Sequence, residues 1–397
     1  MPFTFSREAP MRSPWSALLL LVAAAACSDR GISAPATPAA SFDRVAERDD
    51  DARDVVGGVF TETDDPTSNA VVAFARRADG TLTFVGSYAT GGAGLGSANV
   101  VDPLQSQFAV VLTPDHRYLF AVNAASNSIA AFKIKKRGLE AIGTVASNGD
   151  RPVSLAATNR VLYALNKNSN TVTGFQIDGG KLKAEPRLTR SLSPGAGGGA
   201  AIRFDHDEGL LAITERTSNT IDVFTVRDGV LSRKPVSSVS AGNTPFGFDW
   251  TPDRQLIASE AGTGSVSSYA ASHHGALTPI TSKLSTKQAA PCWLITTHDG
   301  RFAYAANAGS GSVTGFAVSP DGALSILTAS GVTGVLGAGT TPLDLDVSQD
   351  SKFLYVLKAG VNTVGAFAVN HDGSLNALAD GVGGLTSRGG QMGIAAY

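Results

Sequence analysis

The chain is poor in the residues that support several common architectures. Among its 397 residues there are only two cysteines, Cys27 and Cys292, which excludes an internal disulfide framework. No stretch keeps a helical spacing of apolar residues, which argues against a helical fold. The formal net charge of −2 is too balanced for a protein that binds nucleic acid. The 44 glycines instead favour a fold with many tight turns.

Long apolar runs are also scarce, and the longest lies near the N-terminus. Arg7 and Arg12 precede WSALLLLVAAAA (15–26), a run too short for a permanent membrane helix. A basic start, a short apolar run and small residues at its end are typical of a secretory signal. We therefore expect residues 1–27 to be a signal peptide, and the protein to be exported.

Cys27 directly follows three alanines. This arrangement resembles a bacterial lipoprotein cleavage site and predicts that Cys27 is lipidated, although Ala24 stands where such signals usually carry leucine. Ordinary signal cleavage beside an incidental cysteine is the alternative. Residues 28–54 are polar and lack apolar periodicity, which predicts a disordered tether.

A seven-residue pattern recurs through the rest of the chain, with 43 to 58 residues between successive closing aromatics. Its copies are SNAVVAF (68–74), SNSIAAF (126–132), SNTVTGF (169–175), SNTIDVF (218–224), TGSVSSY (263–269), SGSVTGF (310–316) and VNTVGAF (361–367). An apolar strand precedes each copy, and turns such as TPDHR (113–117) and SPDGAL (319–324) flank most of them. Pro-Asp and Asp-Gly between short apolar runs are typical of hairpins.

Each repeat therefore predicts four short antiparallel strands, A to D. Seven such units predict an all-β chain folded as a seven-bladed β-propeller over 55–397. The first unit has VVGGVF (55–60) as strand B but no strand A, whereas GGQMGIAAY (389–397) is left over at the end. We expect this C-terminal segment to supply strand A of the first blade and close the ring, which removes the exposed sheet edges.

A polar residue stands nine positions before each closing aromatic. The set is Asp65, Asn123, Asn166, Glu215, Glu260, Asn307 and Lys358. We expect these residues at the ends of the B strands, around the hub on the face of the B–C and D–A connections. Asparagine there often bonds its own turn, but glutamate and lysine are poorly suited to that role. Glu215 and Glu260 are therefore the predicted catalytic acids or bases. The other five, together with Arg151, are predicted to bind substrate.

The sequence gives little support for a metal site or for a catalytic nucleophile. The six histidines all fall in A–B or C–D turns on the opposite face, namely His116, His206, His273, His274, His298 and His371. The predicted ring therefore has no histidine for a zinc site or a Ser–His–Asp triad. We expect no cofactor and no metal, although the spacing leaves a calcium ion held by the ring oxygens as an alternative. Cys292 is expected to be a small core residue.

With its seven repeats and Asp-Gly turns, the chain resembles the seven-bladed β-propeller lactonase family, over roughly 55–397. That family includes bacterial 6-phosphogluconolactonases and fungal carboxymuconate cyclases. The resemblance implies a Gly-Pro-Arg-His motif in a middle strand A, where this chain has Gly-Gly-Ala-Ala (198–201), and it matches the family acid at Glu215. A family Pro-His pair is Pro-Val (152–153) here, next to Arg151, and a family Asn-Arg-Gly is Asn-Ala-Gly (307–309).

Two functions follow from this pattern. The first is hydrolysis of a non-phosphorylated sugar-acid or muconate-type lactone, since phosphorylated sugar lactones are cytoplasmic and this chain is expected to be exported. The second is a non-catalytic propeller that binds a ligand or a protein partner at the cell envelope. In both, nucleic acid is excluded, and contact with a membrane occurs only through a lipid anchor at Cys27.

Overall fold

The computed structural model describes residues 54–96, 102–386 and 390–397. The predicted signal peptide, Cys27 and nearly all of the predicted tether lie outside these residues. In the described part of the chain, no helix has the length and hydropathy required to cross a bilayer.

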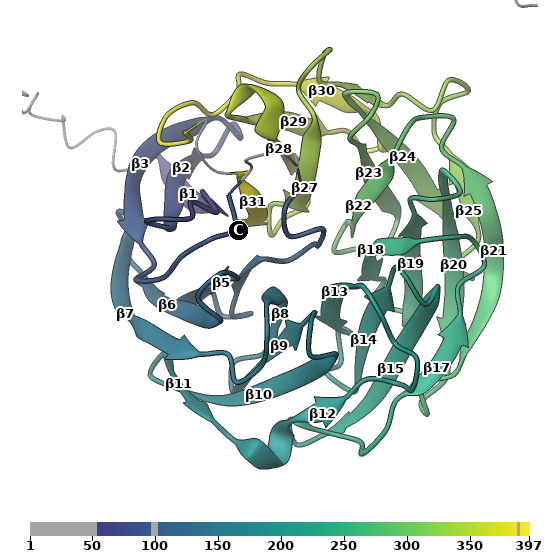
Figure 1. Cartoon of the computed structure of the whole chain (residues 1–397). Helices are drawn as coiled ribbons and strands as arrows, with labels where there is room; N and C mark the ends of the chain where they lie inside the picture. Colours follow the sequence, from purple (N-terminus) through teal and green to yellow (C-terminus); the bar gives the residue numbers. More distant parts are fainter. Residues whose placement is uncertain (1–53, 97–101, 387–389) are drawn as a thin grey trace, which may run out of the picture. The chain divides into compact units, whose positions relative to one another are not determined.

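Seven antiparallel sheets are arranged in a ring, as predicted (Figure 1). From the hub outward, the first blade consists of β31 (Met392–Ala396), β1 (Val55–Glu62), β2 (Ala70–Arg77) and β3 (Leu82–Ala89). The second consists of β4 (Val110–Leu112), β5 (Tyr118–Asn123), β6 (Ser128–Ile134) and β7 (Leu139–Ala146). The fifth consists of β18 (Pro245–Trp250), β19 (Gln255–Glu260), β20 (Ser265–Ala271) and β21 (Leu277–Ser285). The seventh consists of β27 (Pro342–Val347), β28 (Phe353–Lys358), β29 (Thr363–Val369) and β30 (Leu375–Ala377), with a 3₁₀ turn, η3 (Ala359–Val361), after β28.

The remaining three blades each carry an extra short outer strand. The third has β8 (Pro152–Ala157), β9 (Val161–Asn166), β10 (Thr171–Asp178), β11 (Lys181–Ala184), the 3₁₀ turn η2 (Pro186–Leu188) and β12 (Arg190–Ser191). The fourth has β13 (Gly199–Phe204), β14 (Leu210–Glu215), β15 (Thr220–Arg227), β16 (Val230–Leu231) and β17 (Val236–Val239). The sixth has β22 (Pro291–Thr296), β23 (Phe302–Asn307), β24 (Ser312–Val318), β25 (Leu324–Ile326) and β26 (Gly334–Val335). The D position is thus split in two in these blades, where the sequence predicted a single strand.

The closing aromatic of each repeat has the same structural role in every blade. All seven belong to C strands and are at most 3 % exposed. Each lies opposite an apolar residue of the neighbouring B strand, as Phe224 does with Leu211 and Phe367 with Leu354. The aromatic side chains therefore contribute to the hydrophobic core of every blade, where a buried ring contributes most to folding free energy.

The C-terminal segment closes the ring as predicted. β31 pairs antiparallel with β1, from Val59 opposite Ala396 to Glu62 opposite Met392. Arg76 Nε then donates to the carbonyl oxygen of Tyr397 at 2.8 Å, which anchors the last residue to β2. The first blade is thus built from both ends of the propeller sequence.

Tyrosines of three B strands tie adjacent blades together. The hydroxyl of Tyr304 donates to the carbonyl oxygen of Gly373 at 2.9 Å, and Tyr163 and Tyr355 make the equivalent bonds to Gly229 and Gly80. Each acceptor is the glycine of an Asp-Gly turn in the next blade, with a φ between 73° and 84° that favours glycine. The Asp-Gly turns of the repeat therefore serve blade-to-blade contact as well as chain reversal.

Removing one of these inter-blade bonds should destabilise the ring measurably. We expect Tyr304→Phe to lower the free energy of unfolding by about 1 kcal/mol, because the Gly373 carbonyl loses its partner while the ring keeps its packing. Tyr118→Phe is the control, since the Tyr118 hydroxyl makes no hydrogen bond to the described residues. Urea denaturation of both variants measures the difference, and equal midpoints would contradict the role given to the inter-blade bond.

Candidate active site at the hub

A segment between the first two blades crosses the hub. Residues 102–109 leave the sheet before β4, which is only three residues long, and run through the centre of the ring (Figure 1). We call these residues the hub segment. Two of them, Gln105 and Phe108, have positive φ values of 54° and 64°, which is unusual for residues other than glycine. Such strained backbone is common at functional sites.

The hub segment is held by hydrogen bonds to four other blades. The Gln107 side chain bonds both backbone groups of Leu294, donating to its oxygen at 2.8 Å and accepting from its nitrogen at 3.2 Å. The Trp293 indole donates to the Ser106 carbonyl oxygen, and the Phe108 nitrogen donates to Asp344. Further bonds join the segment to Val153, Ser154 and Ala200. The segment is therefore a fixed part of the core that fills the centre of the ring.

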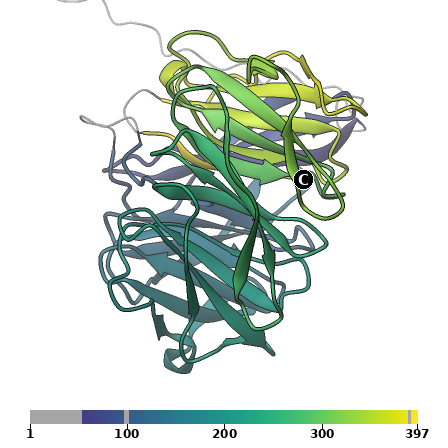
Figure 2. The same ribbon diagram turned by 90° about the vertical axis from the view of Figure 1, so that its right-hand side faces the viewer.

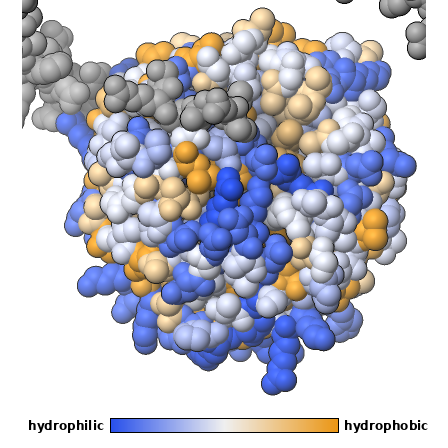
Figure 3. Space-filling view, in the orientation of Figure 1, coloured by the Kyte–Doolittle hydropathy of each residue, from blue (hydrophilic) through white to orange (hydrophobic). Residues whose placement is uncertain are grey.

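Three cations surround the beginning of this segment, where Asp102 and Gln105 are half-buried. Lys167 Nζ and Arg216 Nη1 both donate to the side-chain oxygen of Gln105, at 3.0 and 2.7 Å. Arg151 Nη2 donates to the carbonyl oxygen of Pro103 at 3.0 Å. All three cations are half-buried, and hydrophilic side chains gather at the centre of this face (Figure 3). The arrangement concentrates positive charge around two neutral oxygens, the Gln105 side-chain oxygen and the Pro103 carbonyl oxygen.

The chain around each cation explains its placement. Lys167 and Arg216 directly follow the last residues of β9 and β14, and Arg151 directly precedes β8, so all three reach the hub from strand ends. The Arg216 guanidinium lies 5.3 Å from the centre of the Phe246 ring, which orients it. The buried Nε atoms of Arg151 and Arg216 have no hydrogen-bond partner among the described residues. Because these two Nε atoms are inaccessible, a ligand can reach the guanidinium groups only at their terminal nitrogens.

Asp102 is the acidic partner of this cluster. Burial raises the pKa of its carboxyl to about 7, against the opposing effects of the Gln105 N–H, Arg216 and Lys167. Burial, Arg216 and Arg151 together lower the pKa of Lys167 to about 8, which Asp102 opposes. Asp64 lies close enough to interact with Asp102 and Arg151, and burial raises its pKa to about 7. A carboxyl and an amine that titrate near neutral pH are suited to proton transfer.

Glu215, a predicted catalytic residue, is fully buried beside this cluster. Its Oε2 accepts hydrogen bonds from the Gly197 nitrogen and the hydroxyls of Ser218 and Thr220, at 2.8 to 3.2 Å. Burial and the neighbouring Asp222 raise the pKa of Glu215 to about 8. In this arrangement Glu215 closes its own turn and fastens the preceding loop, and it offers no surface to solvent.

Glu260, the other predicted catalytic residue, is likewise enclosed in its own blade. Its Oε1 accepts from Ser240 and from the Gly242 nitrogen at 2.6 to 3.1 Å, and its Oε2 accepts from Ser265 at 2.7 Å. The Tyr269 hydroxyl donates to the same carboxylate at 3.2 Å. The carboxylate therefore joins the end of its B strand to strand C and to the incoming loop.

The predicted substrate-binding residues of the ring are also occupied locally. Asn166 and Asn307 donate to hydroxyls of the following C strand, which is the turn-closing role considered for asparagine. Asn123 accepts from Asn69 and Thr90 of the first blade. Lys358 bonds Asp380 at 2.6 Å. The polar groups of these four side chains are thus engaged by neighbouring residues of the protein.

Asp65 is not a member of the ring, which corrects the sequence prediction. β1 ends at Glu62, and Asp65 lies in the following turn, where it accepts from the backbone of Thr67 and Ser68. Counted between paired residues, from Thr63 to Ala70, the first B–C connection is two residues longer than the others, so counting back from Phe74 overshoots the strand end. Thr63 holds the equivalent position, because its nitrogen donates to the Ala70 carbonyl oxygen.

Arg151, a predicted substrate-binding residue, contacts the hub segment directly. The Cys292 thiol lies close enough to Asp102 and Arg216 to interact with their charges. Burial raises the pKa of the Cys292 thiol to about 12, and Asp102 adds to this rise. The thiol is therefore protonated and a poor nucleophile near neutral pH. The described residues contain no cluster of three or more histidine, cysteine, aspartate or glutamate side chains arranged to hold a metal ion.

The sequence analysis missed the hub segment and with it Asp102, Gln105, Lys167 and Arg216. These residues lie in or next to connections between strands, outside the repeated pattern from which the site was predicted. DPLQSQF (102–108) contains no glycine and carries two glutamines among apolar residues. That change of composition was the available signal of an ordered segment.

Comparison with known proteins agrees with the fold. A sequence profile of the family described as "Lactonase, 7-bladed beta-propeller" matches residues 66–188 and 257–342, together more than half of the chain. No curated protein matches the sequence significantly.

Solved structures with the same fold are similar over nearly their whole length. A putative 6-phosphogluconolactonase from Bacteroides fragilis is 16 % identical with a TM-score of 0.66, covering 87 % of this chain and 98 % of its own. The corresponding Bacteroides uniformis protein is 18 % identical with a TM-score of 0.66, covering 86 % and 99 %. The periplasmic gluconolactonase of Pseudomonas aeruginosa is 18 % identical with a TM-score of 0.60, covering 86 % and 98 %.

Proposed function

Because the chain belongs to the seven-bladed β-propeller lactonase family, we propose that it hydrolyses a lactone at the hub cluster of Asp102, Lys167, Arg151 and Arg216. The observation that carries the proposal is a carboxyl whose pKa is about 7 beside three cations at the centre of the ring. Ester hydrolysis near neutral pH needs both a base for water and positive charge for the developing oxyanion.

The side chains divide these tasks. Asp102 in its ionised form removes a proton from a water molecule, which attacks the carbonyl carbon of the lactone. Lys167 and Arg216 stabilise the resulting oxyanion, at the place that the Gln105 amide oxygen now occupies. When the ring C–O bond breaks, protonated Asp102 returns its proton to the leaving alkoxide. The products are one hydroxy acid and the regenerated carboxylate.

The charge of the site favours an anionic substrate. Three cations face two carboxyls, Asp64 and Asp102, that are only partly ionised near neutral pH. Half-buried Arg151 is placed to hold a second anionic group of the substrate through its terminal nitrogens. We therefore propose a lactone that carries a carboxylate, of the muconate or sugar-acid type.

Export determines which anionic lactones the protein meets. The proposal includes cleavage of the N-terminal signal and, at Cys27, a lipid anchor in the cell envelope. A non-phosphorylated substrate follows from this location, since phosphorylated sugar lactones are cytoplasmic. The description of one structural neighbour as a periplasmic gluconolactonase agrees with lactone chemistry outside the cytoplasm.

A lactone panel tests the proposal. We expect the full chain to open carboxylate-bearing muconolactones faster than neutral glucono-lactone and faster than 6-phosphogluconolactone, as followed by acid release in a pH-stat. Lys167→Met should lower kcat/KM by about 10- to 100-fold, because it removes a charged hydrogen-bond donor. Lys181→Met, on the exposed outer strand β11, is the matched control. Absence of turnover, or equal rates for the two variants, would contradict catalysis at the hub.

Binding without catalysis is the second candidate. It is favoured by Gln105, whose amide oxygen already satisfies Lys167 and Arg216. On this hypothesis the wild-type protein binds a muconolactone, or an envelope protein, without turnover. Calorimetry with the same lactones, and recovery of a stoichiometric partner that survives Lys167→Met, would distinguish it from hydrolysis.

A further inference from the structure

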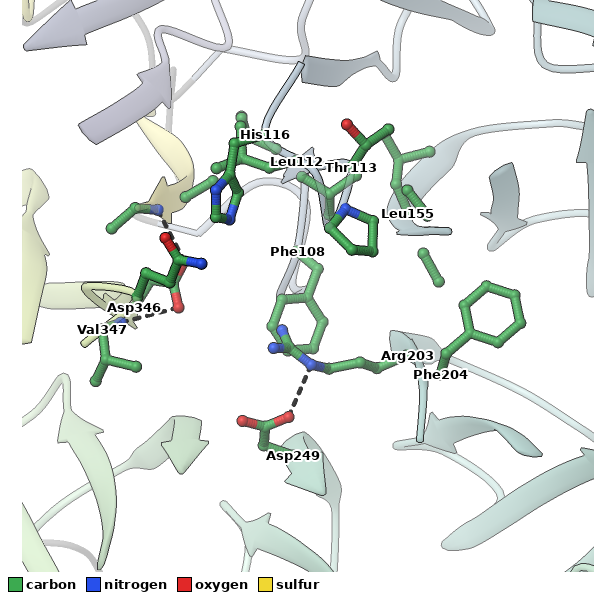
Figure 4. A pocket seen from close by; sticks show the side chains of 18 of the residues that line it. Phe108, Leu112, Thr113, His116, Leu155, Arg203, Phe204, Asp249, Asp346 and Val347 are labelled. Atoms are coloured by element: carbon green, nitrogen blue, oxygen red, sulfur yellow. Dashed lines mark hydrogen bonds and ion pairs between the residues drawn. The ribbon is translucent and has the colours of Figure 1, made fainter. Parts of the chain in front are cut away.

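The opposite mouth of the channel holds a cavity of about 540 Å³ that the proposed reaction does not use (Figure 4). It is lined by the C-terminal ends of the innermost strands of six blades, namely β4, β8, β13, β18, β27 and β31. The A–B turns that follow some of these strands complete the lining. Phe108 of the hub segment lies at its inner end, so the cavity is separated from the cation cluster. Its volume is within the usual range for small-molecule sites.

Arg203 is the cation of this cavity. Its Nε lies 2.7 Å from Asp249 Oδ1, and its guanidinium carbon lies 4.5 Å from the centre of the Phe108 ring. Asp249 is itself fixed, because its Oδ2 accepts from both the nitrogen and the hydroxyl of Thr296. The terminal nitrogens of Arg203 make no hydrogen bond to the described residues. A rigid guanidinium edge is thus available to a ligand (Figure 4).

Asp346 supplies acceptors next to this donor. Its two oxygens accept from the backbone nitrogens of Val347 and Ala396, at 2.9 and 2.8 Å, which leaves further lone pairs free. Burial raises the pKa of Asp346 to about 6, an effect that Arg203 opposes. The carboxyl is therefore largely ionised at neutral pH and accepts hydrogen bonds.

The balance of charge restricts the ligand. The cavity is lined by four acids and by Arg203 as the cation; the acids are Asp205, Glu208, Asp249 and Asp346. Asp205 is paired with Arg254 at 3.1 Å. Imidazoles line the mouth, and burial lowers the pKa of His116 and His298, so both are neutral at pH 7. The excess of carboxylates disfavours an anion, and the free edge of Arg203 disfavours an organic cation.

We propose that this cavity binds a neutral polyhydroxylated molecule, of monosaccharide or disaccharide size. Hydroxyl groups can accept from Arg203 and donate to Asp346 at the same time. The C–H faces of a sugar ring would lie against the apolar walls formed by Phe108, Val110 and Leu155. The site is distinct from the lactone site at the other mouth, which takes an anion.

Calorimetry and saturation-transfer NMR test the proposal with D-glucose, D-galactose, D-mannose and maltose. D-Glucuronate and D-glucosamine serve as anionic and cationic analogues. We expect at least one neutral sugar to bind with a millimolar dissociation constant, and both charged analogues to bind at least about tenfold more weakly. Arg203→Met should weaken binding by about tenfold or more, because it removes the donor edge. Val111→Trp, which fills the cavity from a half-exposed position without deleting a hydrogen bond, should abolish it.

The outcomes separate this site from the proposed lactonase. Circular dichroism must show folded variants, and Arg203→Met and Val111→Trp should retain lactone hydrolysis, whereas Asp102→Asn should retain sugar binding. The proposal is wrong if no neutral sugar binds the wild-type protein, or if a charged analogue binds more tightly. Sugar binding that both cavity variants retain would overturn the assignment to this mouth.

Discussion

Asp102→Asn is expected to lower kcat for lactone hydrolysis by about 10²- to 10⁴-fold, the usual contribution of a general base. Asparagine keeps the shape of the side chain and can still accept the hydrogen bond that the Gln105 nitrogen donates at 2.6 Å. It cannot take a proton from water. The loss should therefore fall on kcat, while the KM for a carboxylate-bearing lactone changes little.

The pH profile should identify the same group. Ionised Asp102 is the active form, so wild-type activity should rise through about pH 7. It should fall again near pH 8, where Lys167 loses its proton. The acidic limb should disappear from the residual activity of Asp102→Asn. A profile that is unchanged in this variant would show that another group acts as the base.

Glu215→Gln is the informative comparison. Burial keeps Glu215 protonated near neutral pH, and glutamine resembles that form, so kcat should change by less than about threefold. If instead Glu215→Gln abolished activity and Asp102→Asn did not, the sequence-based prediction of Glu215 as the catalytic residue would be correct. The two variants therefore decide between the acid matched by family resemblance and the acid placed at the hub.

Urea denaturation of Asp102→Asn at several pH values tests whether unfolding causes the lost activity. The pKa of Asp102 is raised on folding, so between about pH 4 and pH 7 the folded protein binds more protons than the unfolded chain. Stability supplied by protonated Asp102 is thus lost as the pH rises through this window. Asp102→Asn removes that dependence, and the variant should be at least as stable as the wild type at pH 8. A proton-transfer residue maintained at the expense of stability is common in enzymes.

Gln107→Ala is expected to give the largest loss of stability among these variants, about 2–5 kcal/mol in urea denaturation. The substitution leaves the buried N–H and C=O of Leu294 without partners, and each such group costs about 1–3 kcal/mol. Gln107 is completely buried, so water does not replace the amide without rearrangement. Gly247 packs against the same amide, where a Cβ would lie 2.1 Å from Gln107 Oε1.

Gln105→Ala is the matched control for Gln107→Ala. It removes the same side chain two residues earlier, where Gln105 is half-exposed and its cationic partners can be hydrated. Its unfolding free energy should stay within about 1 kcal/mol of the wild type. Faster amide exchange at Leu294 in Gln107→Ala alone would locate the effect at the hub. Similar stabilities of the two variants would show that the hub segment does not hold the blades together.

The sequence predicted the fold in detail, but of the residues in the proposed hub site it indicated only Arg151. Local repetition carries the fold, since each copy contains its own turns and its own buried aromatic, and the missing strand A of the first blade indicated closure by residues 389–397. The prediction that Asp65 ends the first B strand was wrong, because two additional residues lie between that strand end and Phe74. Small insertions of this kind leave the hydrophobic pattern intact and are therefore difficult to see in one sequence.

The hub segment could not be predicted by the same reasoning. Its hydrogen bonds join residues 47 to 236 positions apart, so no local periodicity reports them. Lys167 and Arg216 each follow a ring residue that the repeat did identify, Asn166 and Glu215. The repeat thus located the correct strand ends but selected the residue that closes the turn, one position before the residue that reaches the hub.

The pairing of β31 with β1 sets a condition on biosynthesis. Until Met392–Ala396 have been synthesised, β1 has a free edge and the ring cannot close. A chain that lacks these residues can form individual blades, but its first blade has no strand A. Folding of the complete ring therefore follows synthesis of the last residues, and chains truncated before Met392 should be cleaved faster by proteases than the full chain.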